Sequence, residues 1–531
     1  MTIARWTPPV APTRQEQFLL KRLDRVRKLL GFLRLHRHEL FDEAFQAELA
    51  TMYRSTGAGK AARPPALMAM AMLVQGYLGM SDAEMIELTV VDLRVQMVLG
   101  CLGAEAPPFS QGALQEFRER LIAADLDRRL LERTVALAKR SQAFDYRKLP
   151  TTLRVAIDSS PLEGAGRVED TFNLLAHAAR NVVQCAAGVL GWPYERVCTQ
   201  AGIPLLNASS IKRALDIDWN DVGQKAEAIK TFARQLDALQ GWIAHQLPAE
   251  VAEPPLKTSL ETLVQIRTQD LEPDPTGGAR IRDGVATDRR VSIEDPEMHH
   301  GRKTKSKRFN GFKRHIATDV DRGLILACAL TSANRPEREA TPSLTADLTR
   351  QGLEVDQLLI DRGYINSTLV DDVLRRRGQI VCKPWTSQNG RHFPKSAFRL
   401  NLRDRTIECP AGHVQRVSFG TVVTFDPDAC DPCALRPHCT TAAFGHGRSV
   451  AIAENEPLQH RLRTQIQTAA GRQALRARTM IEHKLAHISQ RQGNDARYIG
   501  IRKNTFDLRR ASAIQNLETL HLAEVQSGKA A

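Results

Sequence analysis

Two aspartates in this sequence each follow a short apolar stretch that has the composition of a buried strand. Asp158 comes after residues 153–157, in which apolar and other residues alternate, and Asp361 comes after the apolar stretch 357–360. Taken singly, either aspartate can be a turn or helix-cap residue. If strand 153–157 lies centrally in the sheet and beside strand 357–360, the fourth in order, the two carboxylates face each other. Such a pair costs free energy unless a cation lies between them.

Magnesium is the cation that this arrangement favours, because it prefers oxygen ligands and completes its octahedron with water and phosphate. Two such ions roughly 3.5–4 Å apart activate the attacking oxygen and stabilise the leaving oxygen in phosphoryl transfer. A third acid, late in the chain and on a helix, is then needed for the second ion. Glu482 meets this requirement, since residues 472–491 predict one helix with Arg478 a turn before Glu482. The alternative for this pair is a surface ion pair worth about a few tenths of a kcal/mol.

Basic residues are clustered ahead of the second aspartate. The segment 299–315 contains seven Lys or Arg residues and no acid. The whole chain has 74 basic and 60 acidic residues, a net charge of +14, which favours a polyanionic partner. A solvated loop is the alternative for the cluster. Together with two arginines on the late helix, the candidate DNA-binding residues are Arg302, Lys303, Lys305, Lys307, Arg308, Lys313, Arg314, Arg478 and Arg491.

Four of the nine cysteines lie close together in the sequence and have the spacing of a metal site. These are Cys409, Cys430, Cys433 and Cys439. The Cys-x2-Cys pair resembles a zinc knuckle, and the segment around Cys409 would supply the other half, with His413 or His438 able to replace one thiolate. An iron–sulfur cluster and four unliganded thiols are the alternatives. The other five cysteines are scattered, as expected for small core residues.

The elements that must position these residues follow one another in a definite order. Strands are predicted at 153–157, 309–317, 324–330, 357–360 and 379–382, with a hairpin turn at 319–323 and helices at about 341–352 and 367–377. The first 140 or so residues predict helices, and Ser81 with Glu84 predicts a capping box. The short turn before Ser81 is compatible with a DNA-reading helix-turn-helix or with a plain helical hairpin. Residues 163–271 return to helical periodicity.

Several of these stretches resemble insertion-sequence transposases that have an RNase-H-like DDE core. The matching segments are VAIDSS (155–160), NGFK (310–313), LTSAN (330–334), LIDRGY (359–364), Arg478-x3-Glu482, YIGIRK (498–503), DPE (295–297) and FRERL (117–121). The resemblance implies that Asp158, Asp361 and Glu482 are the catalytic triad and hold two Mg²⁺ or Mn²⁺ ions. The family signature also has Tyr and Lys near the Glu, where this chain has Leu475 and Ser489. That departure concerns contacts with the DNA ends, and Arg491 is a candidate replacement for the missing cation.

We therefore expect a multidomain α+β protein. Residues 1–145 are predicted to form a helical N-terminal domain that binds DNA ends. Residues 146–162, 280–395 and 465–525 would form the RNase-H-like α/β core, interrupted by a mainly helical insertion at 163–279. Residues 396–464 would form a small Cys-rich, zinc-ribbon-like insertion that holds structural zinc. The 531 residues are too many for one compact core.

The expected function is cleavage of the ends of an insertion sequence and joining of the 3′-OH ends to target DNA. The partners would be the terminal inverted repeats and the target DNA, with a homodimer on paired ends. A DNA-binding protein without activity on the same fold, a nuclease without strand transfer and a zinc-containing regulator are the competing hypotheses. No membrane partner is expected, because the longest apolar run is far too short to span a bilayer, and the expected location is the cytoplasm.

Overall fold

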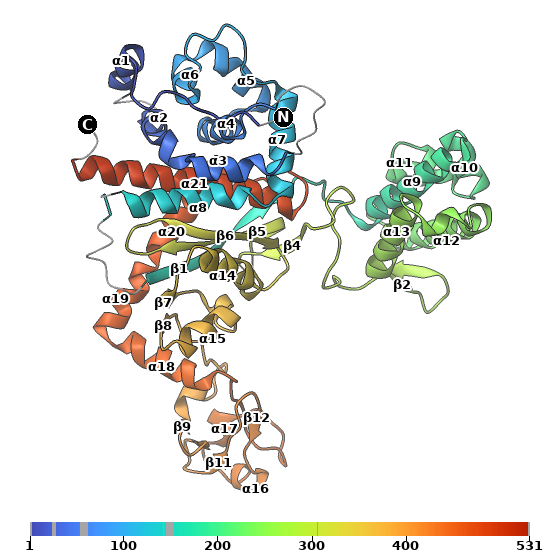
Figure 1. Ribbon diagram of the computed structural model, residues 1–531. Coiled ribbons are helices and arrows are strands. Elements are labelled where there is room, and N and C mark those ends of the chain that lie inside the picture. Colours follow the sequence, from blue (N-terminus) through green and yellow to red (C-terminus); the bar gives the residue numbers. More distant parts are fainter. Residues whose placement is uncertain are drawn as a thin grey trace.

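The computed structural model describes residues 3–23, 28–53, 62–141, 143–144, 153–304 and 306–528. Figure 1 shows a main body, a helical part that stands to one side, and a small part at the end away from the N-terminal helices. Each of the three has its own cluster of buried apolar side chains. The prediction of a mixed α and β protein with a helical N-terminal region is confirmed. In the described residues, no helix combines the length and apolar character needed to cross a membrane.

The N-terminal region consists of helices, as its sequence periodicity predicts. They are α1 (Arg14–Arg22), α2 (Lys28–Leu40), α3 (Glu43–Ala50), α4 (Pro65–Leu78), α5 (Asp82–Val91), α6 (Leu93–Leu99), α7 (Gln111–Ala123) and α8 (Asp127–Arg140). The capping box of Ser81 and Glu84 at the start of α5 is confirmed. Helix α5 contains acidic but no basic residues, so its charge does not suit the phosphate-lined groove of DNA. The pair α4–α5 is therefore better described as a plain helical hairpin.

A six-stranded mixed sheet lies at the centre of the main body. Strand β1 lies between β5, to which it is antiparallel, and β7, to which it is parallel, so the predicted central position of the first strand is confirmed. The order is β4–β5–β1–β7–β8, and β6 also pairs with β5. The strands are β1 (Leu153–Glu163), β4 (His299–Arg302), β5 (Arg308–Asp319), β6 (Ile325–Ser332), β7 (Val355–Leu359) and β8 (Gln379–Val381).

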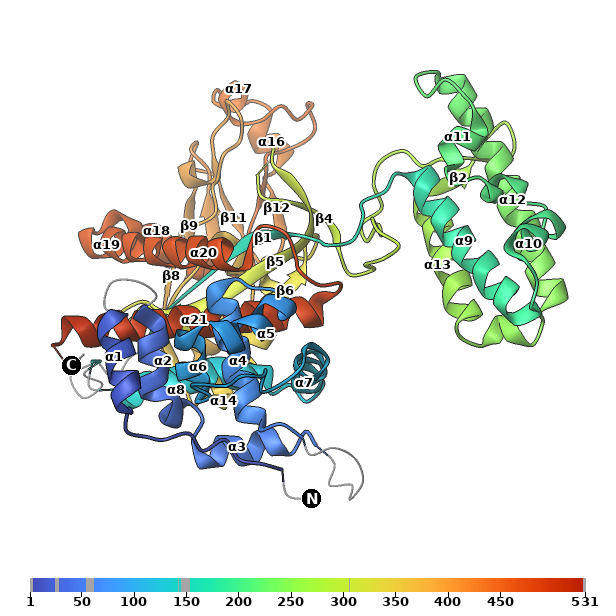
Figure 2. The ribbon, with the colours of Figure 1, turned by 90° about the horizontal axis from the view of Figure 1, so that it is seen from above.

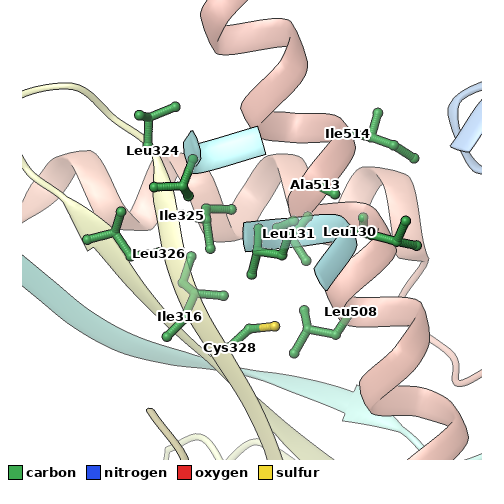
Figure 3. Packing of buried hydrophobic residues seen from close by; sticks show 14 of the residues in the cluster. Leu130, Leu131, Ile316, Leu324, Ile325, Leu326, Cys328, Leu508, Ala513 and Ile514 are labelled. Atoms are coloured by element: carbon green, nitrogen blue, oxygen red, sulfur yellow. The ribbon is translucent and has the colours of Figure 1, made fainter. Parts of the chain in front are cut away.

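Helices cover the sheet and tie it to the N-terminal region. They are α14 (Thr341–Arg350), α15 (Thr368–Arg375), α18 (Glu456–Gln467), α19 (Ala469–Ala477), α20 (Thr479–Gln492) and α21 (Ile501–Gln526). Helices α21 and α8 lie side by side over β6 (Figures 1 and 2). Leu131 of α8 and Leu508 of α21 belong to the same buried cluster as Ile325 and Cys328 of β6 (Figure 3).

A buried ion pair reinforces this junction between α8 and α21. Arg502 and Arg509, both on α21, donate hydrogen bonds to the carboxylate of Asp127, which is fully buried at the start of α8. Burying the Asp127 carboxylate without a partner would cost free energy. Its pairing with the two arginines therefore favours the arrangement in which α8 and α21 are docked. The N-terminal helices and the sheet therefore share one hydrophobic core. The predicted boundary between residues 145 and 146 lies outside the described residues.

The segment between β1 and β4 forms the helical part that stands to one side of the main body (Figures 1 and 2). It contains α9 (Thr171–Leu190), α10 (Tyr194–Gln200), α11 (Ile211–Leu215), α12 (Val222–Gln246), α13 (Leu256–Asp270) and the hairpin β2 (Leu271–Pro273) with β3 (Ala279–Ile281). Its buried cluster is separate from that of the sheet and includes Phe172, Phe232 and Leu263. Because it has its own apolar core, this helical segment is a compact unit between two strands.

The segment with the four clustered cysteines is made of short elements. They are β9 (Arg399–Asn401), β10 (Thr406–Glu408), β11 (Val414–Arg416), β12 (Val422–Thr424), α16 (Pro427–Cys430), α17 (Arg436–Cys439) and β13 (Ser449–Ala451). We call residues 396–464 the cysteine segment. Its own buried apolar cluster consists of Phe398, Ile407, Val417, Phe425, Val450 and Ile452, whereas Leu458 and Leu462 near its end belong to the main cluster.

Two sequence predictions for the main body are wrong in their details. The first strand does not end at Asp158, because β5 continues to pair with β1 as far as Glu163. The late helix is not continuous over 472–491. It is divided into α19 and α20, and Arg478 is the residue at the junction. The short strand β4, which pairs with the start of β5, was not predicted from the sequence.

Candidate active site

The three predicted carboxylates line one cavity. Asp158, Asp361 and Glu482 all border a cavity of about 490 Å³ on the main body. Asp158 belongs to β1, and Asp361 comes two residues after the end of β7, directly after Ile360. Glu482 lies in the first turn of α20. The fold thus brings together three acids that lie far apart in the sequence.

The pairing of β1 with β7 places the two aspartates at corresponding positions. The last parallel pair is Ala156 with Leu359. Asp158 and Asp361 each lie two residues beyond that pair, and the ends of parallel strands point to the same edge of a sheet. Val155, Ala156 and Ile157 are completely buried, which fixes the strand that carries Asp158. The carboxylate itself is only partly buried, with 16% of its side chain exposed.

Glu482 is held beside the sheet by helix α20. The helix buries Ile481, Leu485 and Ile488, which recur at helical spacing and pack into the main core. Helix α20 contacts β1 directly. The Glu482 side chain is 58% exposed, so the third acid is free to change its rotamer at the rim of the cavity.

Arg478 connects the first and third acids. Its Nη1 lies 2.9 Å from Oδ2 of Asp158, and its Nη2 lies 3.5 Å from Oε1 of Glu482. The break between α19 and α20 falls at this residue, so its side chain spans from the helix junction to the strand. A guanidinium group therefore compensates the negative charge of the two carboxylates.

The protonation of Asp158 reflects the crowding of charges in the cavity. Burial raises the pKa of Asp158 above its usual value, while Arg478 and the N–H of Ser159 lower it. The negative charges of Asp361 and Glu337 raise this pKa further. The carboxylates thus repel one another, and a cation in the cavity would relieve that repulsion.

Two family models match parts of the chain. One is described as a transposase DDE domain and matches residues 409–521, which include Glu482 and most of helix α21. The other is described as a transposase domain (DUF772) and matches residues 21–120 of the helical N-terminal region. Both matches are to transposase families, and they support an insertion-sequence DDE transposase. Searches among curated proteins and among solved structures found no match. The two matched segments lie on either side of Asp158 and Asp361, so the matches support a transposase and a DNA-processing enzyme without covering the first two acids.

The predicted DNA-binding residues occupy several different settings in the structure. Arg302, Lys303 and Lys313 line the cavity together with the acids, and Lys307 and Arg308 are exposed nearby in the chain. Lys305 lies outside the described residues. Arg491 pairs with Glu518 of α21 at 2.7 Å. Basic side chains therefore border the carboxylate cavity, as a phosphate-binding site requires.

Arg314 has a different position from its neighbours in the basic cluster. It is 1% exposed, and its guanidinium donates to the carbonyl oxygens of Pro161 and Gly493 and to Oγ of Ser489. Its charge is therefore enclosed by protein acceptors and does not face solvent. Ser489, where the family signature has Lys, lines the cavity and accepts this hydrogen bond. Arg314 supports β1 and α20 from behind the cavity.

Sequence reasoning missed a group of polar residues around the two aspartates. Oγ of Ser159 donates to Oε1 of Glu337 at 2.6 Å, and both residues line the cavity. Nδ1 of His315 lies 2.7 Å from the hydroxyl of Tyr364, three residues after Asp361. Burial lowers the pKa of His315 to about 3, so this imidazole is neutral. Ser159 and Tyr364 belong to the motifs that resemble the family, but only the pairing of the strands brings them to one place.

The four clustered cysteines also lie together, in the cysteine segment. Cys409, Cys430, Cys433 and Cys439 line a cavity of about 30 Å³, together with His413. Burial raises the pKa of Cys439, and the other three cysteines raise it further, although Arg448 opposes them. Across the described ranges, no three His, Cys, Asp or Glu side chains are arranged so that they could hold one metal ion. This applies to the cysteines and to the carboxylates alike.

Proposed function

We propose that this transposase cuts the ends of an insertion sequence and joins the freed 3′-OH ends to target DNA. The observation that carries the proposal is the equivalent position of Asp158 and Asp361 beyond one parallel strand pair, in a cavity that Glu482 also lines. A central strand flanked by antiparallel and parallel neighbours further supports an RNase-H-like core. On this proposal, Asp158, Asp361 and Glu482 are the catalytic carboxylates.

The residues of the cavity fit a divalent metal ion. Mg²⁺ commonly takes only one or two protein carboxylates and completes its coordination with water and substrate phosphate oxygens. Asp158 and Asp361 are coupled closely enough for one charge to raise the pKa of the other, so they suit the first ion. Glu482, mobile at the rim, would join when DNA is bound and hold a second ion. Bound Mg²⁺ or Mn²⁺ supplies charge stabilisation to the phosphoryl group.

The reaction consists of two displacements at phosphorus. In the first, the oxygen of a water molecule bonds to phosphorus at the element's end, the bond from phosphorus to the 3′ oxygen breaks, and that oxygen takes up a proton. In the second, the freed 3′-OH attacks a target phosphodiester, loses its proton and displaces another 3′ oxygen. One cavity can serve both steps, because only the attacking oxygen differs.

The basic residues at the cavity would bind the DNA backbone. Arg302, Lys303 and Lys313 border the acids and would hold phosphates on either side of the scissile bond. Arg478 would transfer from Asp158 to a DNA phosphate once a metal ion compensates that carboxylate. We propose that the helical N-terminal region contributes to recognition of the element's ends, and that two copies act on paired ends.

We also propose that the cysteine segment binds structural zinc. Four cysteines around one small cavity support this, as does the small apolar core of the segment. The thiolates would have to draw closer around the ion than they lie in this structure. An iron–sulfur cluster would use the same thiolates, and metal analysis separates the two.

The first experiment follows cleavage of a labelled DNA that carries the element's own terminal repeat. Wild-type protein is compared with Asp361→Asn, in Mg²⁺ and in EDTA. Asp371→Asn is the matched control, because Asp371 is an exposed aspartate on α15. We expect nicking at the repeat boundary that needs Mg²⁺ and that only Asp361→Asn abolishes.

Three other outcomes would change the conclusion. Binding of the repeat without cutting in any metal would favour a DNA-binding protein without activity. Cutting without joined products would favour a nuclease. Equal cutting by wild type and Asp361→Asn would overturn the assignment of the site.

A further inference from the structure

A fourth acidic side chain, Glu337, lines the cavity of the three proposed catalytic carboxylates. It opens the short 3-10 helix η3 (Glu337–Ala340), which follows strand β6. The sequence gives little sign of it, because Glu337 does not directly follow an apolar strand. Its neighbour Glu339, two residues later in the same turn, is exposed and does not line the cavity.

Contacts on both sides hold the Glu337 carboxylate in place. Oε1 accepts the 2.6 Å hydrogen bond from Oγ of Ser159, the residue after Asp158. Oε2 lies so close to Gly363 that a Cβ at that glycine would collide with it. Gly363 is two residues after Asp361, within the 3-10 helix η4 (Arg362–Tyr364). Glu337 therefore touches the chain segments that carry both catalytic aspartates.

The charge of Glu337 has little compensation within the protein. Arg478 pairs with Asp158 and Glu482 but not with Glu337. No ion pair of Glu337 occurs within 4.0 Å in the part of the chain that the structure describes. The amine of Lys313 attracts this carboxylate at longer range, yet its Nζ donates to the carbonyl oxygen of Arg335. A carboxylate held near other carboxylates in this way costs free energy unless a cation approaches.

We propose that Glu337 is a fourth acidic residue of the divalent-cation site, oriented by Ser159 and by the close approach of Gly363. The inference rests on the proposed function, since it concerns the same cavity. Glu337 adds negative charge to the cavity and thereby strengthens the binding of the ion. A side chain at position 363 would displace this carboxylate from its present position.

The test measures binding of Mn²⁺ alone to the full-length protein, by electron paramagnetic resonance of the free ion. Glu337→Gln keeps the shape and the hydrogen bond from Ser159 but removes the charge. We expect the dissociation constant for Mn²⁺ to rise about 10-fold, the size of effect typical of residues that support metal ligands. Glu339→Gln, the matched control in the same turn, should bind Mn²⁺ as the wild type does.

Three further variants separate the explanations. If Glu337 only fixes Ser159, then Ser159→Ala should weaken binding as much as Glu337→Ala, and Glu337→Gln should have no effect; this result would overturn the proposal. If Asp158→Asn also binds Mn²⁺ as tightly as wild type, the proposed function itself fails. Loss of binding in Asp158→Asn with unchanged binding in Glu337→Gln refutes only the role of Glu337. Melting temperatures in EDTA show which variants fold, and the comparison of Glu337→Ala with Ser159→Ala replaces Glu337→Gln if that variant does not.

Discussion

The carboxylate cavity and the cysteine segment are assembled in opposite ways. Asp158 and Arg478, which form an ion pair in the cavity, are 320 positions apart in the sequence. They meet only because a buried sheet and a helix hold them. The four cysteines lie within one short segment, between Cys409 and Cys439, whose apolar core consists of a few residues. The first site therefore depends on the fold, whereas the fold of the second segment would depend on its metal.

This difference predicts that each site can be lost without the other. A change at the carboxylates should remove chemistry and leave the structure intact. A change at the cysteines should loosen the local structure and leave the main body folded. Four predictions test this contrast, from the largest expected effect to the smallest.

Asp158→Asn and Glu482→Gln should abolish cleavage while binding to the element's ends remains close to wild type. Stabilisation by metal ions is worth several kcal/mol in the transition state, so the cleavage rate should fall by about 1000-fold or more. Single-turnover cleavage and gel-shift assays on the same DNA measure the two quantities. Wild-type cleavage rates in either variant would contradict the assignment.

Cys430→Ser should reduce bound zinc from about one ion per chain to almost none. The cysteine segment should then be cut by protease many times faster, while the main body resists. Plasma emission spectroscopy and limited proteolysis provide the measurements. Cys198→Ser is the control, because Cys198 is buried in the separate helical segment. A protein that contains neither zinc nor iron would show that the four thiols carry no metal.

Arg314→Met should destabilise the main body by about 2–4 kcal/mol, because the partly buried carbonyl oxygens of Pro161 and Gly493 lose their donor. The midpoint of urea unfolding, followed by fluorescence, should fall. Arg308→Met, an exposed position on the same strand, should leave the midpoint unchanged. An equal shift in both variants would mean that Arg314 has no special supporting role.

Lys303→Ala should weaken DNA binding only a few-fold at low salt. Each lost phosphate contact lowers the slope of log affinity against log salt by about one, independent of DNA sequence. Fluorescence anisotropy at several salt concentrations gives this slope. Lys257→Ala, on an exposed face of α13, should keep the wild-type slope.

Local sequence patterns predicted much of the main body. Alternating apolar residues identified the strands, Gly323 marked the hairpin, and the order of elements placed Asp158 beside Asp361. These features depend on short segments and on simple rules of connection. The prediction that the acids lie near one another followed from them.

The remaining features depend on contacts that no local pattern contains. Strand β1 continues beyond Asp158 because β5 pairs with it, which the sequence of β1 alone does not reveal. Arg314 belongs to a run of basic residues, which suggests that it is exposed. The chain passes from a loop into strand β5, however, and Arg314 is buried within that strand. Glu337 reaches the cavity through η3, whose position follows only from the completed sheet. Such residues are found through geometry rather than through composition.

Helix α21 also has a consequence for how the protein is made. It comes after the strands of the sheet in the sequence, yet it packs on α4, α8 and β6. At roughly 5–20 residues per second, a ribosome needs on the order of half a minute to two minutes to synthesise a chain of this length. During this time the apolar surfaces that α21 covers stay exposed on the nascent chain. A translation product that stops before α21 therefore lacks the element that joins its N-terminal helices to its sheet.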